Sequence, residues 1–143
     1  MSELAVEESP LLLGLNEVQK RAVSTVDGPV LILAGAGSGK TRVITHRIAY
    51  LIQEKQINPE NILAVTFTNK ASREMKYRVE ELLGRMGQGL WVTTFHSMGA
   101  RVLRKHASAI GYDRNFSIYD DSQQKSTMKA VIKLLNLDPK RYA

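Results

Sequence analysis

The stretch LILAGAGSGKT, residues 31–41, decides the fold because it joins an apolar run to a glycine-rich turn that ends on Lys-Thr. The strict pattern of a phosphate-binding loop is G-x-x-x-x-G-K-[ST]. Ala34 takes the place of the first glycine, and the rest of the pattern is complete. This order predicts a short buried parallel strand over 30–33, a loop that holds phosphate, and a helix over 40–55.

The residues of this loop suit the binding of a nucleotide. Glycines let the backbone curl so that successive N–H groups point inward, and the following helix directs its positive N-terminal dipole to the same place. We expect Lys40 to reach the β- and γ-phosphates and the Thr41 hydroxyl to bind Mg²⁺, so both are predicted catalytic residues. The predicted nucleotide-binding residues of the loop are Ala34, Gly35, Ala36, Gly37, Ser38, Gly39, Lys40 and Thr41. The alternative, a glycine-rich turn with a surface lysine, does not explain the strand–loop–helix context.

Short apolar runs alternate with amphipathic helices along the rest of the chain. Asn16 and Gln19 form a capping-box pattern that predicts a helix over 16–23. The other predicted strands cover 62–67 and 90–95, a short extended piece covers 116–119, and the other predicted helices cover 70–83, 96–110 and 121–135. The predicted fold class is therefore α/β, a parallel P-loop NTPase sheet flanked by helices. The helix faces expected to point inward include Ile44, Ile48, Leu51 and Ile52, and Met128, Val131, Ile132 and Leu135.

Composition excludes several classes of protein. The 143 residues have the length of about one domain. Without cysteine the chain has no disulfide and no thiolate metal site, and no apolar run is long enough to span a membrane. Acidic residues stand near the N-terminus where a signal peptide would be basic, so we expect a cytoplasmic protein. The net charge of +6 fits a polyanionic partner as well as it fits plain solubility.

Two short motifs follow the second and third predicted strands. TFTNKA covers 66–71 and TFHS covers 94–97, and ligands of open α/β sheets gather at the carboxyl ends of strands. Aromatic rings can stack on unpaired bases while polar groups contact phosphates. The predicted DNA-binding residues are Thr66, Phe67, Thr68, Asn69, Thr94, His96 and Ser97. On pattern alone Phe67 and Phe95 are more typical of a core, Asn69 could N-cap the next helix, and His96 could cap or pack.

The residues around the loop bear on the base of the nucleotide. A guanine-specific site would be expected to carry N-K-x-D, but Ser72 stands where the aspartate would follow Asn69 and Lys70. The amide of Gln19 could both donate to and accept from the adenine edge, although a capping glutamine needs no second role. The residues alone leave both roles of Gln19 open.

Four segments, LNEVQKRAV, AGAGSGKTRV, AVTFTNKASREMKYRV and VTTFHS, occur in this order from Leu15 on. Together they resemble the superfamily 1 DNA helicases of the UvrD/Rep/PcrA type, which commonly begin their loop with alanine. The resemblance implies that Gln19 contacts adenine, that Arg42 packs on the adenine face, and that the two strand-end motifs line a track for single-stranded DNA. It also implies ATP and Mg²⁺ as cofactors, single-stranded DNA and single/double-strand junctions as partners, and a 3′→5′ helicase activity in DNA repair or replication.

The resemblance also suggests how the chain is organised. It implies that 15–110 is the N-terminal part of a first RecA-like ATP-binding domain and that 111–143 is the start of a helical insertion subdomain, while the residues themselves indicate a loose leader over 1–14. The sequence contains no Asp-Glu pair to hold the Mg²⁺ shell, and Asp120-Asp121 is typical of a helix N-cap. We therefore expect an incomplete sheet and the N-terminal part of a longer helicase, which alone hydrolyses ATP poorly or not at all. The alternative is a stand-alone P-loop nucleotide-binding module or small kinase-like protein without helicase activity.

Overall fold

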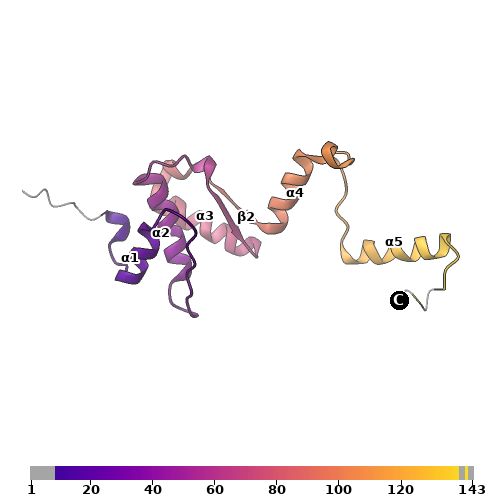
Figure 1. The fold of residues 1–143 in the computed structure, drawn as a ribbon, viewed down its shortest axis with the longest axis horizontal. Coiled ribbons are helices and arrows are strands. Elements are labelled where there is room, and N and C mark those ends of the chain that lie inside the picture. The colour runs from indigo at the N-terminus through magenta and orange to yellow at the C-terminus, as the bar shows by residue number, and fades with distance from the viewer. Residues whose placement is uncertain (1–8, 139–140, 142–143) are drawn as a thin grey trace, which may run out of the picture. The chain divides into compact units, whose positions relative to one another are not determined.

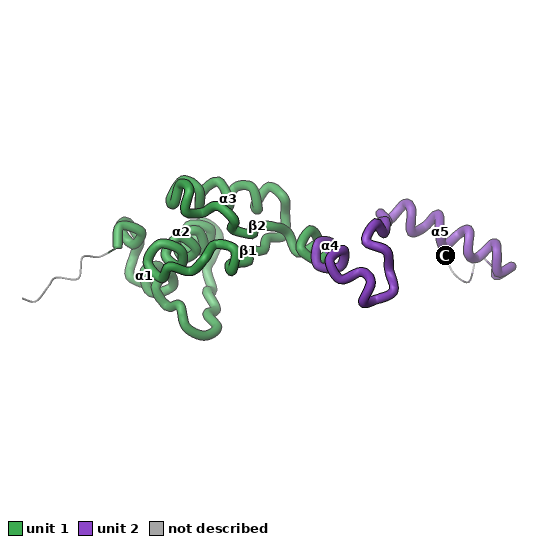
Figure 2. Tube along the Cα trace, turned by 90° about the horizontal axis from the view of Figure 1, so that it is seen from above, with its two compact units in different colours: residues 1–99 green, residues 100–143 purple. Residues whose placement is uncertain are grey.

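The computed structural model describes residues 9–138 and residue 141. The chain divides into two compact units, residues 1–99 and 100–143, and each is described by itself (Figure 2). Figure 1 shows the order of the helices and strands along the chain. None of the helices within the described residues is long and apolar enough to cross a membrane.

The sheet of the first unit consists of two parallel strands. β1 (Leu63–Thr66) pairs with β2 (Trp91–Thr94) in a register that sets Leu63 opposite Trp91 and Thr66 opposite Thr94. Parallel strands need a crossover, and here it consists of α3 (Asn69–Leu83) and the 3₁₀ turn η3 (Gly84–Gly87). The strands predicted over 62–67 and 90–95 and the helix between them are therefore confirmed, and the chain is α/β.

The main core lies between the sheet, α3 and α2 (Lys40–Gln53). Its buried members are Leu11, Ile48, Ala49, Ile52, Met75, Val79, Leu83 and Leu90. Of the predicted inward face of α2, Ile48 and Ile52 are buried, Leu51 is half-buried and Ile44 is 40% exposed. Val43, Thr45 and Ala49 are buried as well. A further 3₁₀ turn, η2 (Pro59–Asn61), leads into β1.

The predicted leader contributes to this core. The 3₁₀ turn η1 (Pro10–Leu12) places Leu11 among the core residues, and the Leu11 carbonyl lies 2.7 Å from Nδ1 of His46 on α2. Within residues 9–14, Leu11 is therefore packed into the core, while Leu13 is exposed. The rest of the predicted leader, 1–8, lies outside the described residues.

A second apolar cluster fixes α1 (Glu17–Ser24) to α2 through Leu15, Val23 and Val43. The capping box is confirmed: Asn16 Oδ1 accepts from the Gln19 N–H at 2.9 Å, and Gln19 Oε1 accepts from the Asn16 N–H at 3.1 Å. At the other end of α1, the Arg47 guanidinium donates to the carbonyls of Ala22 and Thr25. These carbonyls lie where a helix end leaves acceptors unpaired, so Arg47 completes the docking of α1.

The strand predicted over 30–33 does not form. This segment is irregular, with Leu31 83% and Leu33 87% exposed. A strand is held by hydrogen bonds to a neighbouring strand, and β1 and β2 pair only with each other among the described residues. The apolar run therefore lacks the ladder that would bury it.

The second unit begins within α4 (Phe95–Lys105), which is followed by the 3₁₀ turn η4 (Ala107–Ile110) and by α5 (Asp121–Leu134). The predicted helix over 96–110 is thus split in two, and the extended piece predicted over 116–119 is irregular. Asp120 caps α5 by accepting from the Gln123 N–H, which confirms the N-cap reading of Asp120-Asp121. Of the expected inward residues of α5 only Ile132 is buried, because little of the described chain packs on that face; Met128, Val131 and Leu135 are exposed.

Candidate nucleotide-binding loop and strand-end motifs

Gly39 forms the junction between the loop and α2. It is the N-cap of the helix and has a left-handed φ of 85°. A Cβ at this position would also lie 3.0 Å from Nε2 of Gln19. A side chain at position 39 would therefore be strained and would press on Gln19, so glycine is required for two separate reasons.

The N-terminus of α2 is open to an anion. Glycine offers no side chain to cap the helix, and the first turn contains no acidic residue. The first bond into the helix runs from the Val43 N–H to the Gly39 carbonyl, at 3.0 Å. The N–H groups of the three residues before Val43 have no intrahelical acceptor, and the helix dipole adds positive potential at the same place. This is the donor set that phosphate requires.

The loop holds the Lys40 ammonium close to its own backbone. Lys40 Nζ donates to the carbonyls of Ala34, at 3.1 Å, and Gly35, at 2.6 Å. The Ser38 hydroxyl donates to the same Gly35 carbonyl at 2.7 Å and tightens the turn. The structure thus places the Lys40 ammonium against the backbone of the predicted loop residues.

Gln19 is the residue outside the loop that reaches it. Its Nε2 donates to the Ser38 carbonyl at 3.2 Å while its Oε1 accepts from the Asn16 N–H. These two bonds fix the direction of the amide and leave one N–H and one lone pair for a further ligand. The capping role and a ligand-binding role are therefore compatible, although the sequence presented them as alternatives.

The other two predicted residues of this site differ in their surroundings. The Arg42 guanidinium lies against the backbone before α1, since its Nη2 would be 3.1 Å from a Cβ at Gly14. Thr41 is exposed at the start of α2. Within residues 9–138 and 141, no group of three or more His, Cys, Asp or Glu residues is placed to hold a metal ion.

The two strand-end motifs share one construction. Thr66 and Thr94 face each other across the sheet and are 8% and 6% exposed. Thr66 Oγ1 donates to the Thr68 carbonyl at 3.0 Å and lies 2.5 Å from Ser72 Oγ. Thr94 Oγ1 donates to Ser97 Oγ at 3.0 Å and accepts from the Ser97 N–H at 3.2 Å. Both threonine hydroxyls are therefore engaged inside the protein and fix the turn after their strand.

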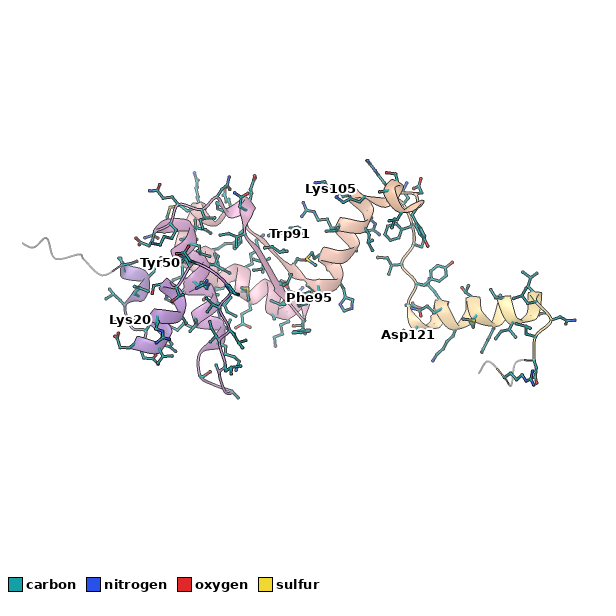
Figure 3. All side chains as sticks on the ribbon, in the orientation of Figure 1. Lys20, Tyr50, Trp91, Phe95, Lys105 and Asp121 are labelled. Atoms are coloured by element: carbon teal, nitrogen blue, oxygen red, sulfur yellow. The ribbon has the colours of Figure 1, made fainter. Side chains whose placement is uncertain are left out.

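The side chains that follow these threonines are open to solvent. Phe67 is 88% exposed and Phe95 46% exposed, and their ring centroids are 5.5 Å apart with the planes tilted by 51°. Figure 3 shows Phe95 where β2 passes into α4. The core reading of these two rings is thus wrong. His96 and Ser97 are exposed beside them.

Thr68 and Asn69 also lie at this end of the sheet. Thr68, rather than Asn69, is the N-cap of α3, because its hydroxyl accepts from the Ala71 N–H at 3.1 Å. Asn69 is the first helical residue and is exposed. The sequence drew attention to Ser72 only because it replaces the aspartate of a guanine-binding motif. Its contact with Thr66 could not be predicted, because it arises only when α3 places Ser72 over the strand end.

Comparison with known proteins places this geometry in a family. Residues 15–143 match the family described as the UvrD/REP helicase N-terminal domain. The chain belongs to the UvrD/REP helicase family. It is 60% identical to the ATP-dependent DNA helicase PcrA of Bacillus subtilis (strain 168) over 132 residues, which are 92% of this chain and 18% of that protein.

Other relatives give the same match. The ATP-dependent DNA helicases PcrA of Staphylococcus epidermidis and Staphylococcus aureus are 58% and 56% identical over 132 residues. The chain spans 18% of the length of these relatives. The UvrD/REP match begins at Leu15, so it includes the Gln19 amide, the loop and both strand-end motifs.

Proposed function

We propose that this chain is the ATP- and single-stranded-DNA-binding N-terminal portion of an ATP-dependent 3′→5′ DNA helicase. The fold is that of a RecA-like P-loop NTPase domain, followed by the start of a helical insertion subdomain. The whole protein couples ATP hydrolysis to translocation and duplex unwinding in DNA repair or replication, in the cytoplasm. The observation that carries the proposal is the open helix end behind Gly39, with Lys40 held in the loop and Gln19 bound to it.

The loop side of the proposal follows from its donors. The N–H groups at the start of α2 and the Lys40 ammonium would bind the phosphates of ATP, and residues 34–41 would surround them. The second N–H and second lone pair of Gln19 match the donor and acceptor of the adenine edge. Arg42 would lie on the adenine face, for which a guanidinium is chemically suited.

The Thr41 hydroxyl would be the ligand that this chain gives to Mg²⁺, a cation that prefers oxygen. When bound, Mg²⁺ neutralises charge that develops on the phosphate oxygens during transfer. Lys40 would hold the same phosphates in position from the loop side. Because the sequence lacks an Asp-Glu pair, we expect residues 1–143 alone to turn over ATP poorly.

The DNA side of the proposal uses the strand ends. The exposed ring of Phe67 would stack on a base, and the exposed polar groups of Thr68, Asn69, His96 and Ser97 would contact the sugar-phosphate backbone. Thr66 and Thr94 would act through their neighbours, because their hydroxyls are already bonded. Such a track is tolerant of sequence, since every base offers a face for stacking. Single/double-strand junctions would be its natural substrates.

The test is ATP hydrolysis by the protein at its natural length, measured with and without oligo(dT). We expect strong stimulation by the oligonucleotide. Lys40→Ala should weaken ATP binding by at least tenfold, because it removes the ammonium from the loop. Lys76→Ala is the matched control, since Lys76 is an exposed residue of α3 that makes a 3.8 Å surface pair with Glu80. ATP turnover that does not respond to DNA would instead support a stand-alone nucleotide-binding module.

A further inference from the structure

The sheet register brings two phenylalanines to one edge. Thr66 and Thr94 are paired across the parallel strands, so the residues that follow them, Phe67 and Phe95, leave the sheet side by side. Their ring centroids are 5.5 Å apart and the planes are tilted by 51°. The distance falls within the range of favourable aromatic pairs.

The two rings differ in how firmly they are held. Phe95 is the first residue of α4 and only 46% exposed, and the Thr94–Ser97 hydrogen bonds fix the turn around it. Phe67 is 88% exposed, and the ring recorded against it is that of Phe95. An exposed side chain keeps its rotamer freedom unless a neighbour restricts it. Phe95 is therefore the neighbour that limits where the Phe67 ring can lie.

We propose that Phe95 is a positioning residue for base stacking by Phe67. The inference rests on the proposed binding of single-stranded DNA, and it gives a role in that binding to a second aromatic ring. Phe95 covers part of the Phe67 ring and leaves the remainder open for a base. A ring already held in its binding position loses less conformational freedom when the base arrives, which raises affinity without a new contact to DNA.

The experiment compares two oligonucleotides on the protein at its natural length, with fluorescence anisotropy as the readout. One is oligo(dT), and the other has the same length and phosphates but abasic sites. Wild-type protein should bind oligo(dT) more tightly than the abasic strand, and Phe67→Leu should remove most of that difference. Equal binding of both strands by wild type would overturn the stacking function itself, and the present inference with it.

Phe95→Leu tests the inference separately. We expect a loss of about threefold to tenfold in affinity for oligo(dT) and no change for the abasic strand, in keeping with the size of an aromatic pair. Phe95→Tyr should restore the affinity because it keeps the ring. In the Phe67→Leu background, Phe95→Leu should cause no further loss, because its effect passes through Phe67.

Three results would overturn the inference while leaving DNA binding intact. The first is an unchanged affinity of Phe95→Leu for oligo(dT), and the second is an equal loss of affinity for oligo(dT) and for the abasic strand. The third is a full additional loss of oligo(dT) affinity in the double variant, which would make Phe95 a direct base contact. Tyr77→Leu is the control for loss of an exposed ring elsewhere, since Tyr77 is a 61% exposed residue of α3. It should leave both affinities at the wild-type value.

Discussion

Two apolar runs, 30–33 and 63–66, lead into predicted ligand-binding motifs, yet only one of them is a strand. Residues 63–66 form β1 because β2 lies beside them in register. Residues 30–33 stay irregular, although the loop that follows them has its open helix end, its Ser38–Gly35 hydrogen bond and its bond to Gln19. The comparison shows that the loop is specified by local residues, whereas a strand depends on a partner that can be distant in sequence.

The largest expected difference is in stability, between Leu33 of the irregular run and Leu90, which precedes the strand that pairs with the 63–66 run. Leu90, directly before β2, is 9% exposed, whereas Leu33 is 87% exposed. Leu90→Ala should lower the free energy of unfolding by about 2–5 kcal/mol, the range for a buried leucine, and Leu33→Ala by under about 0.5 kcal/mol. Urea unfolding followed by circular dichroism measures both. Similar losses would show that the 30–33 run is buried in solution.

A smaller change in free energy is expected for a substitution inside the loop. Gly39→Ala puts a Cβ into a left-handed backbone at a cost of about 1–2 kcal/mol, and it also presses on the Gln19 amide. Gly35→Ala is the matched control, since nothing lies within 4 Å of its Cβ. ATP binding measured by calorimetry should fall clearly for Gly39→Ala and less for Gly35→Ala. If both variants bind ATP equally, the loop does not depend on its left-handed junction.

The smallest expected effect is the pH dependence of α5, which is another element specified by local residues. The Gln123 N–H and then the Ser122 hydroxyl lower the pKa of Asp120 below its ordinary value of 3.8. A lowered pKa means that this carboxylate stabilises the helix above pH 3.8 and loses that effect as the pH falls through the folded-state pKa. An NMR titration should give an Asp120 midpoint below 3.8, with fraying of the first turn of α5 at lower pH. A midpoint at or above 3.8 would contradict the cap.

Much of this structure follows from local patterns in the sequence. The capping box at Asn16 and the N-cap at Asp120 are present as predicted, because each depends on residues only three positions apart. The strands after Ile62 and Leu90 could be predicted because a helix of suitable length lies between them. These local signals are present in the sequence and do not depend on contacts with distant residues.

The features that could not be predicted depend on contacts between distant residues. Three features depend on which elements of the fold come into contact. They are the irregular structure of 30–33, the exposed face of α5 and the pairing of Phe67 with Phe95. The burial of Thr66 is another case, since the Ser72 hydroxyl reaches the Thr66 hydroxyl only after α3 folds back over β1. The sequence around an apolar or hydroxyl residue at a strand end looks the same whether that residue faces solvent, a ligand or a helix.

The contact of Lys40 with the carbonyls of Ala34 and Gly35 has a consequence for turnover. If the loop binds a nucleotide as proposed, the Lys40 ammonium exchanges these two hydrogen bonds for bonds to phosphate. It therefore has hydrogen-bond acceptors in both states. Departure of the spent nucleotide returns the lysine to the same carbonyls. The net gain from the bonds of the Lys40 ammonium to phosphate is therefore reduced by the two backbone bonds that it gives up.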